Sequence, residues 1–241
     1  MPEEPAAHDA GGKPNPWPEP RWLEAHESPF GIRVYDCRKT TQETLVWTTR
    51  EESAKEWLRL TMANGEEFRE AAMPDALMVP CLLPYSTPAE REEGRYVRPG
   101  RMEETWCVDF YDGSFHFIQA LESRLVYRAR VRPAGPESLI ITHLEVHPEE
   151  AEAGPSHALD AVDYLMKAYL FRWVAPHPFP PRFRDHPEGD LASYSFFKYG
   201  RRALFGTFES TRQFMGLPWD PQKVIHYGLP DTTKAELECE K

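Results

Sequence analysis

The fold is decided by residues 106–119, which read WCVDFYDGSFHFIQ. The central pair Asp112-Gly113 is typical of a two-residue β-hairpin turn. A turn there aligns four couples of residues across the hairpin: Tyr111 with Ser114, Phe110 with Phe115, Asp109 with His116, and Val108 with Phe117. The apolar side chains then share one face and the ionisable ones share the other, which is the pattern that specifies strand register.

Two more segments with alternating character extend this hairpin. Residues 124–131 and 138–147 each predict a strand, so residues 104–147 predict a four-stranded antiparallel meander. We expect Leu125 and Tyr127 to lie beside Phe117 and Phe115 on the apolar face, and Arg128 to lie near His143 on the other. That second face collects six ionisable residues: Asp109, His116, Arg128, Arg130, His143 and Glu145.

The rest of the chain predicts shorter elements around this sheet. Further strands are expected near residues 31–37, 43–48 and 76–83, and amphipathic helices near 50–63 and 157–173. Both helices are expected on one face of the sheet, which gives an α+β fold. Two irregular segments are long enough to cover the polar face. They are a charged loop, 86–104, and a proline-rich connector, 174–190.

The ends of the chain differ from its middle in composition. Residues 1–25 are rich in proline, and residues 229–241 are acidic, so we expect a disordered arm and a disordered tail around a single α+β domain, 26–228. Trp17 and Trp22 are exceptions within the arm, because tryptophans in such segments often dock on the domain.

Composition excludes several classes of protein. The chain has 241 residues, of which 41% are hydrophobic, enough for a sizeable core. Its net charge of −11 argues against a protein that coats nucleic acid or an anionic membrane. The sequence contains no signal peptide and no apolar run long enough to span a membrane, and its four cysteines are scattered. We therefore expect a cytoplasmic protein, and the excess of arginine over lysine favours a bacterial source.

The polar face allows two interpretations. Antiparallel sheets often keep one solvated face, on which cross-strand ion pairs each contribute a fraction of a kcal/mol. Alternatively, the face is a ligand-binding or catalytic surface. Asp109 would then orient His116 as a general base, while Arg128 and Arg130 would hold a carboxylate or a phosphate.

Two weaker candidates involve other chemistry. His143, Glu145 and His147 alternate along one strand and would offer two nitrogens and an oxygen to a divalent metal. Cys37 lies beside Arg38, which would favour a reactive thiolate, although a small buried residue at a strand end is the more common reading. The sequence has no nucleotide-binding loop, nucleophile elbow or zinc-finger spacing, and it indicates no particular cofactor.

Three functions remain open at this stage. The first is a binding or regulatory protein with a protein partner, which fits the lack of a catalytic motif. The second is an enzyme that acts on a small anionic substrate at the polar face. The third is a metal-binding protein. Neither nucleic acid nor membrane is expected as a partner.

Overall fold

The hairpin at residues 106–119 has the predicted register in the computed structural model, which describes residues 17–88 and 90–227. Strands β5 (Trp106–Tyr111) and β6 (Ser114–Gln119) pair so that Asp109 faces His116. Asp112 and Gly113 both have positive φ, 49° and 66°, as a type I′ turn requires. The choice of the turn residues therefore sets the register of this hairpin.

The meander is part of a six-stranded antiparallel sheet with the order β3-β8-β7-β6-β5-β4. Its other strands are β3 (Leu77–Tyr85), β4 (Gly94–Val97), β7 (Arg124–Gly135) and β8 (Ser138–Val146). The strand predicted near 76–83 is confirmed as the edge strand β3. The segment 86–104, expected to be a loop, contains the second edge strand, β4. Four residues are too few to show a clear alternation in the sequence.

Irregularities in β6 and β7 change two details of the predicted pairing. Tyr127 faces Phe117 as expected, but a register shift after Phe117 pairs Leu125 with Ile118. Leu125 therefore packs on the opposite face of the sheet. His143 faces Arg130 rather than Arg128, because the length of the turn between β7 and β8 was not fixed by the sequence. Arg128 faces Glu145 instead.

A second, smaller sheet has the order β1-β2-β11-β10, with β10 and β11 parallel. Its strands are β1 (Trp22–Leu23), β2 (Val34–Asp36), β10 (Pro176–Pro178) and β11 (Phe205–Thr207), and β9 (Trp173–Val174) pairs separately with β12 (Leu217–Pro218). The strand predicted near 31–37 therefore belongs to this small sheet and not to the meander. Likewise, the connector 174–190 contributes β10.

The strand predicted at 43–48 is wrong. Helix α1 (Arg38–Glu43) precedes this segment, and residues 44–50 form no regular element. Leu45 and Trp47, which suggested a buried strand face, are 69% and 78% exposed. Alternating apolar residues indicate a strand only where a neighbouring surface covers one face.

The N-terminal arm joins the fold at its last part. Trp22 packs its ring against Tyr35 and Phe208, and Leu23 is fully buried. These contacts agree with the expected docking of Trp22. Residues 1–16 of the predicted arm and the whole predicted tail, 229–241, lie outside the described residues.

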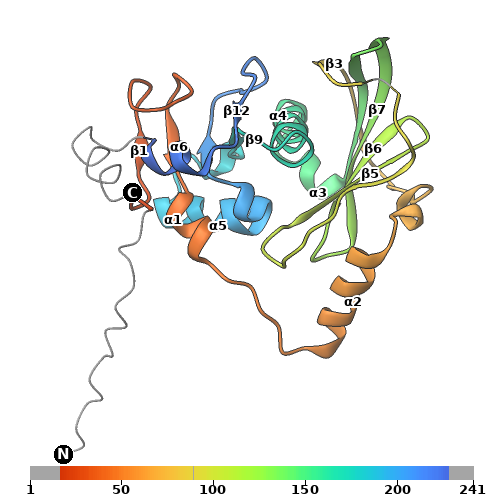
Figure 1. Cartoon of the computed structure of the whole chain (residues 1–241), viewed down its shortest axis with the longest axis horizontal. Coiled ribbons are helices and arrows are strands. Elements are labelled where there is room, and N and C mark those ends of the chain that lie inside the picture. Colours follow the sequence, from red (N-terminus) through yellow and green to blue (C-terminus); the bar gives the residue numbers. More distant parts are fainter. Residues whose placement is uncertain (1–16, 89, 228–241) are drawn as a thin grey trace, which may run out of the picture.

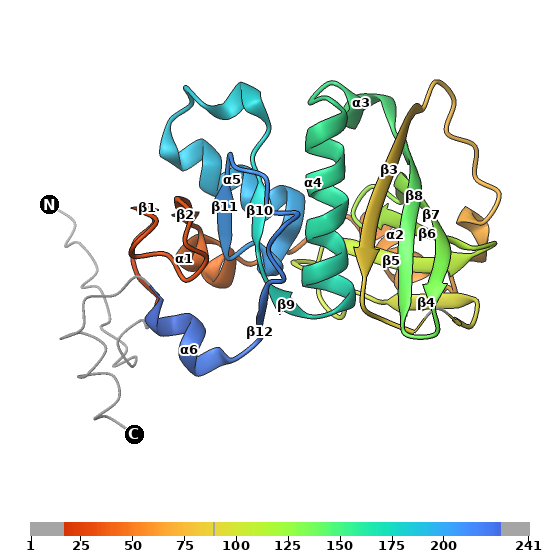
Figure 2. The same cartoon turned by 90° about the horizontal axis from the view of Figure 1, so that it is seen from above.

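The two long predicted helices are present but lie on opposite faces of the large sheet (Figures 1 and 2). Helix α4 (Pro155–Leu165), continued by the π-helix η2 (Met166–Leu170), packs on the face that carries Val108 and Phe117. Helix α2 (Glu51–Met62) instead packs Leu60 on the face of Cys107 and Ile118. The α+β class is confirmed, whereas the packing of both helices on one face is not.

Helix α4 lies between the large and the small sheet (Figure 2). It is therefore buried on almost every side, and its polar side chains need internal partners. Asp163, for example, accepts hydrogen bonds from Lys167 at 2.5 Å and from Tyr85 at 3.0 Å. Burial nevertheless raises the pKa of Asp163 to about 6.

The remaining helical segments are short or cover the small sheet: η1 (Glu66–Phe68), α3 (Pro148–Ala151), η3 (Pro181–Phe183), α5 (Glu188–Tyr199), η4 (Gly200–Arg202) and α6 (Pro221–His226). Among the described residues, no helix combines the length and the apolar character that crossing a membrane would require.

Candidate functional site

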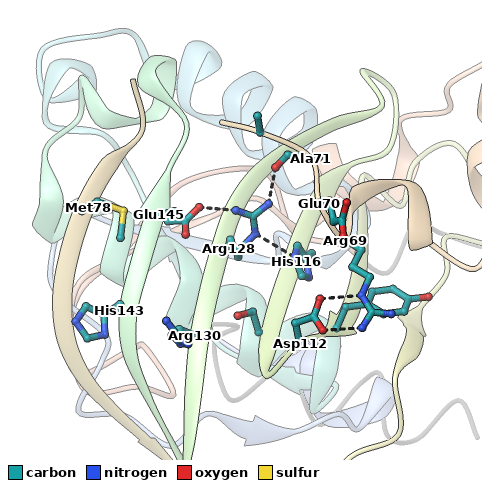
Figure 3. A pocket seen from close by; sticks show the side chains of 13 residues that line it. Arg69, Glu70, Ala71, Met78, Asp112, His116, Arg128, Arg130, His143 and Glu145 are labelled. Atoms are coloured by element: carbon teal, nitrogen blue, oxygen red, sulfur yellow. Dashed lines mark hydrogen bonds and ion pairs between the residues drawn. The ribbon is translucent and has the colours of Figure 1, made fainter. Parts of the chain in front are cut away.

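The polar face of the large sheet forms the floor of a cavity of about 450 Å³, here called the open-face cavity (Figure 3). Strands β6, β7 and β8 supply the floor, and residues 69–72, which follow η1, form part of the wall. Neither of the two segments expected to cover this face lines the cavity. Five of the six predicted site residues line it: His116, Arg128, Arg130, His143 and Glu145. The sixth, Asp109, does not.

Arg128 is fixed by three hydrogen bonds at the centre of the floor. Its guanidinium donates to Glu145 at 2.6 Å, to the ring nitrogen Nε2 of His116 at 3.1 Å, and to the backbone oxygen of Ala71 at 2.5 Å (Figure 3). These bonds join three strands and the wall segment. With this many partners inside the protein, Arg128 serves to hold the cavity together rather than to hold an anion.

His116 is a neutral imidazole in this environment. Burial, together with the nearby positive charge of Arg128, lowers the pKa of His116 to about 4. Because Nε2 accepts the hydrogen bond from Arg128, the ring proton lies on Nδ1. The Nε2 lone pair therefore accepts the hydrogen bond from Arg128 and is not available to act as a general base.

Asp109 faces His116 across the strands but binds a different partner. Both of its carboxylate oxygens accept hydrogen bonds from Arg95, at 2.7 and 2.9 Å, and both side chains are almost completely buried. The hypothesis that Asp109 orients His116 is therefore wrong. Burial raises the pKa of Asp109, and the Arg95 guanidinium opposes that shift.

Gly65 leaves the space that the Asp109 carboxylate occupies. It has a positive φ of 90°, and a Cβ atom added there would lie 1.9 Å from an oxygen of Asp109. Any other residue at position 65 would displace the buried Arg95–Asp109 pair.

A second ion pair closes the rim of the open-face cavity. Arg69 donates two hydrogen bonds to Asp112, at 2.7 and 2.6 Å (Figure 3). Its guanidinium also lies over the ring of Tyr111. The same arginine contacts Glu93. The positive charge of Arg69 is therefore also neutralised within the protein.

Arg130 differs from the other arginines of this cavity. Its guanidinium has no hydrogen-bond or ion-pair partner in the part of the chain that the structure describes. The neighbouring His143 is exposed, and within the described part of the chain its ring has one hydrogen-bond partner, the hydroxyl of Thr142 at 3.1 Å. These two side chains are the ones in the cavity best able to accept a ligand.

The predicted metal triad is not assembled. The His147 side chain caps helix α3 by accepting a hydrogen bond from the backbone of Glu149, and Glu145 is paired with Arg128. In residues 17–88 and 90–227, no three His, Cys, Asp or Glu side chains form a group that could hold a metal ion. His143 lines the open-face cavity, whereas His147 lies beyond the end of β8, so the three side chains have separate contacts.

The thiol of Cys37 is buried and lies 3.1 Å from the hydroxyl of Ser195, which in turn lies 3.0 Å from Nε2 of His177. Burial raises the pKa of the Cys37 thiol, so a reactive thiolate is not formed. All three side chains are fully buried. The group is an internal polar contact between the small sheet and α5.

Sequence reasoning missed Arg69 and Arg95, and it assigned Asp112 to the turn without predicting its ion pair with Arg69. Arg95 lies in a segment read as a loop, and Arg69 lies in an irregular stretch without periodicity. The sequence did contain one signal. Asp109 lies between Cys107 and Tyr111 on a strand, and a carboxylate that is buried there requires a cationic partner. Nothing in the sequence indicated which arginine it would be.

No protein-family model matches this chain, and neither a curated protein nor a solved structure is detectably similar to it.

Proposed function

We propose that this chain is a binding protein whose open-face cavity takes a small ligand with one anionic group. The main observation behind the proposal is that the Arg130 guanidinium, on the cavity floor, has no hydrogen-bond or ion-pair partner among the described residues. A planar guanidinium can donate two parallel hydrogen bonds to a carboxylate. Of the other charged residues that line the cavity, Arg69 and Arg128 already have carboxylate partners, and Glu70 forms no ion pair with the described residues.

The apolar part of the lining and the volume of the cavity indicate the size and character of the rest of the ligand. Met78, Ala71 and Ala72 add apolar surface beside the polar floor. The volume of about 450 Å³ fits a small organic molecule. A short aliphatic or aromatic monocarboxylate matches both features, with its carboxylate at Arg130 and its carbon skeleton against the apolar wall.

Binding is favoured over acid–base catalysis at this site. His116, the residue placed to move a proton, is neutral and already accepts a hydrogen bond through Nε2. Asp109 is held by Arg95 outside the cavity. The residues therefore support recognition of an anion better than proton transfer.

A titration of the full chain with benzoate and butyrate tests the proposal. We expect the side-chain NMR resonance of Arg130 to shift and saturate, and Arg130→Gln to abolish saturable binding. Arg132→Gln is the matched control, since Arg132 is exposed on the same strand but does not line the cavity. Saturable binding that survives in Arg130→Gln, or no binding of either carboxylate, would contradict the proposed function.

A further inference from the structure

A second cavity lies at the β4 edge of the large sheet, on the face that packs against α4 and η2. It measures about 450 Å³, and its walls come from β4, the start of β5, the end of η2, and η4. We call it the arginine cavity, because Arg98, Arg172 and Arg202 line it. Glu104 is the one carboxylate among the lining residues.

The three arginines have no ion-pair partner anywhere in residues 17–88 and 90–227. Arg98 makes one long hydrogen bond, 3.4 Å, to the backbone oxygen of Ala63. Glu104 accepts a hydrogen bond at 2.7 Å from the backbone of Gly100 and forms no ion pair in the same part of the chain. Three positive side chains and one negative side chain leave this cavity with an excess of two positive charges.

The backbone of Arg172 gives an independent indication. This residue directly follows Phe171, the C-cap of η2, and has a φ of 57°. That position after a helix is usually a glycine, because a side chain crowds the backbone in the left-handed conformation. Strained residues of this kind gather at functional sites. An arginine at a position that favours glycine, lining a cavity together with two other arginines, points to a role for its guanidinium.

We propose that the arginine cavity binds a small molecule that carries a phosphate group. A phosphate monoester has a charge of about −1.5 to −2 at neutral pH, which matches the excess positive charge of the cavity. Its three terminal oxygens accept several hydrogen bonds at once, whereas a carboxylate is satisfied by one guanidinium. Three arginines from separate elements therefore suit a phosphate better than a carboxylate.

The lining also has room for an organic part of the ligand. Tyr96 is 39% exposed and forms one side of the cavity, with Val97 and Leu170 nearby in the lining. The cavity is larger than a phosphate ion alone would fill, since sites for small organic ligands span roughly 300–1,000 Å³. The ligand class is thus a phosphorylated small molecule with some apolar surface.

Calorimetric titration of the full chain with inorganic phosphate, pyrophosphate and phenyl phosphate tests this site. We expect saturable binding, at least about tenfold weaker in Arg202→Gln because each lost contact is a charge-assisted hydrogen bond. Arg172→Gly should weaken binding to a similar extent. The Tm of this variant should equal or exceed that of the wild type, because glycine suits the left-handed backbone at this position. Loss of binding in that variant cannot then be ascribed to unfolding.

A control variant makes the outcome decisive. Arg132→Gln should bind phosphate as the wild type does, because Arg132 is exposed and lines neither cavity. Failure of all three phosphates to bind overturns the proposal, as does equal binding by Arg202→Gln and the wild type. Malonate that binds as tightly as pyrophosphate, with the same dependence on Arg202, would overturn the assignment to phosphate.

Discussion

The open-face cavity and the arginine cavity have the same volume but organise their charges in opposite ways. In the open-face cavity, Arg69 and Arg128 are both paired with carboxylates, and among the described residues Arg130 and Glu70 are the lining charges without an ion-pair partner. In the arginine cavity, none of the three arginines has an ion-pair partner among the described residues. The charges of the first cavity are therefore largely neutralised within the protein, whereas the second cavity gathers arginines without carboxylate partners in the described chain.

A charged side chain can either stabilise the fold through an ion pair or remain available to bind a ligand. A buried charge that has a partner contributes to stability mainly because removing either member leaves the other uncompensated. An unpaired charge at a cavity wall contributes little to stability and is available to a ligand. Substitutions of paired and unpaired residues should therefore have clearly different effects on the free energy of unfolding.

The largest effect is expected for Asp109→Asn. It leaves the buried guanidinium of Arg95 without its carboxylate, which typically costs about 3–5 kcal/mol of unfolding free energy. Chemical denaturation followed by circular dichroism measures the change. The matched control is Asp112→Asn, which breaks the solvent-exposed pair with Arg69. Similar losses in the two variants would contradict the distinction between buried and exposed pairs.

Features that depend on residues close together in the sequence could be predicted, and features that depend on distant residues could not. Asp112-Gly113 set the register of the hairpin locally, and the alternation of residues 106–119 fixed which side chains share a face. The same reasoning brought His116, Arg128 and Arg130 into one cavity.

Contacts between distant segments were not predictable in this way. Arg95 reaches Asp109 from an edge strand too short to recognise, and α2 covers the face opposite to that of α4. The arginine cavity joins residues from β4, η2 and η4, which no local pattern connects. Such sites depend on how elements pack, and packing is not encoded in periodicity.

The second prediction concerns pH and His116. Its pKa is about 4 in the folded protein against 6.5 ordinarily, so the unfolded chain binds more protons between these values. The free energy of unfolding should therefore fall as the pH is lowered from 6.5 to 4, by about 3 kcal/mol for this residue. His157 and His177, whose pKa values burial lowers to about 4 and 3, act in the same direction.

Comparing His116→Gln with the wild type isolates the first contribution. Glutamine can still accept a hydrogen bond from Arg128 but does not titrate. Urea denaturation at several pH values should show a shallower loss of stability in the variant. An unchanged dependence on pH would mean that His116 is protonated or exposed in the folded protein.

A smaller effect, of opposite sign, is expected for Arg172→Gly. The left-handed backbone costs a residue with a side chain roughly 1–2 kcal/mol, and the greater freedom of glycine in the unfolded chain offsets about 0.5–1 kcal/mol of the relief. A net gain of about 0.5–1 kcal/mol should appear as a higher Tm in thermal denaturation. A loss of stability would show that the Arg172 side chain supports the fold, which would weaken the contrast between the two cavities.

The smallest effects are expected for the unpaired arginines. Arg130→Gln and Arg202→Gln remove positive charges that have no partner in the described chain, so each should change the unfolding free energy by no more than about 0.5 kcal/mol. Arg128→Gln is the informative comparison, because that guanidinium joins three strands and the cavity wall. Denaturation of the three variants under one set of conditions makes the test. If Arg202→Gln proves as unstable as Arg128→Gln, the arginine cavity has a structural role. Removing an arginine whose role is to bind a ligand should leave the unfolding free energy of the protein alone unchanged.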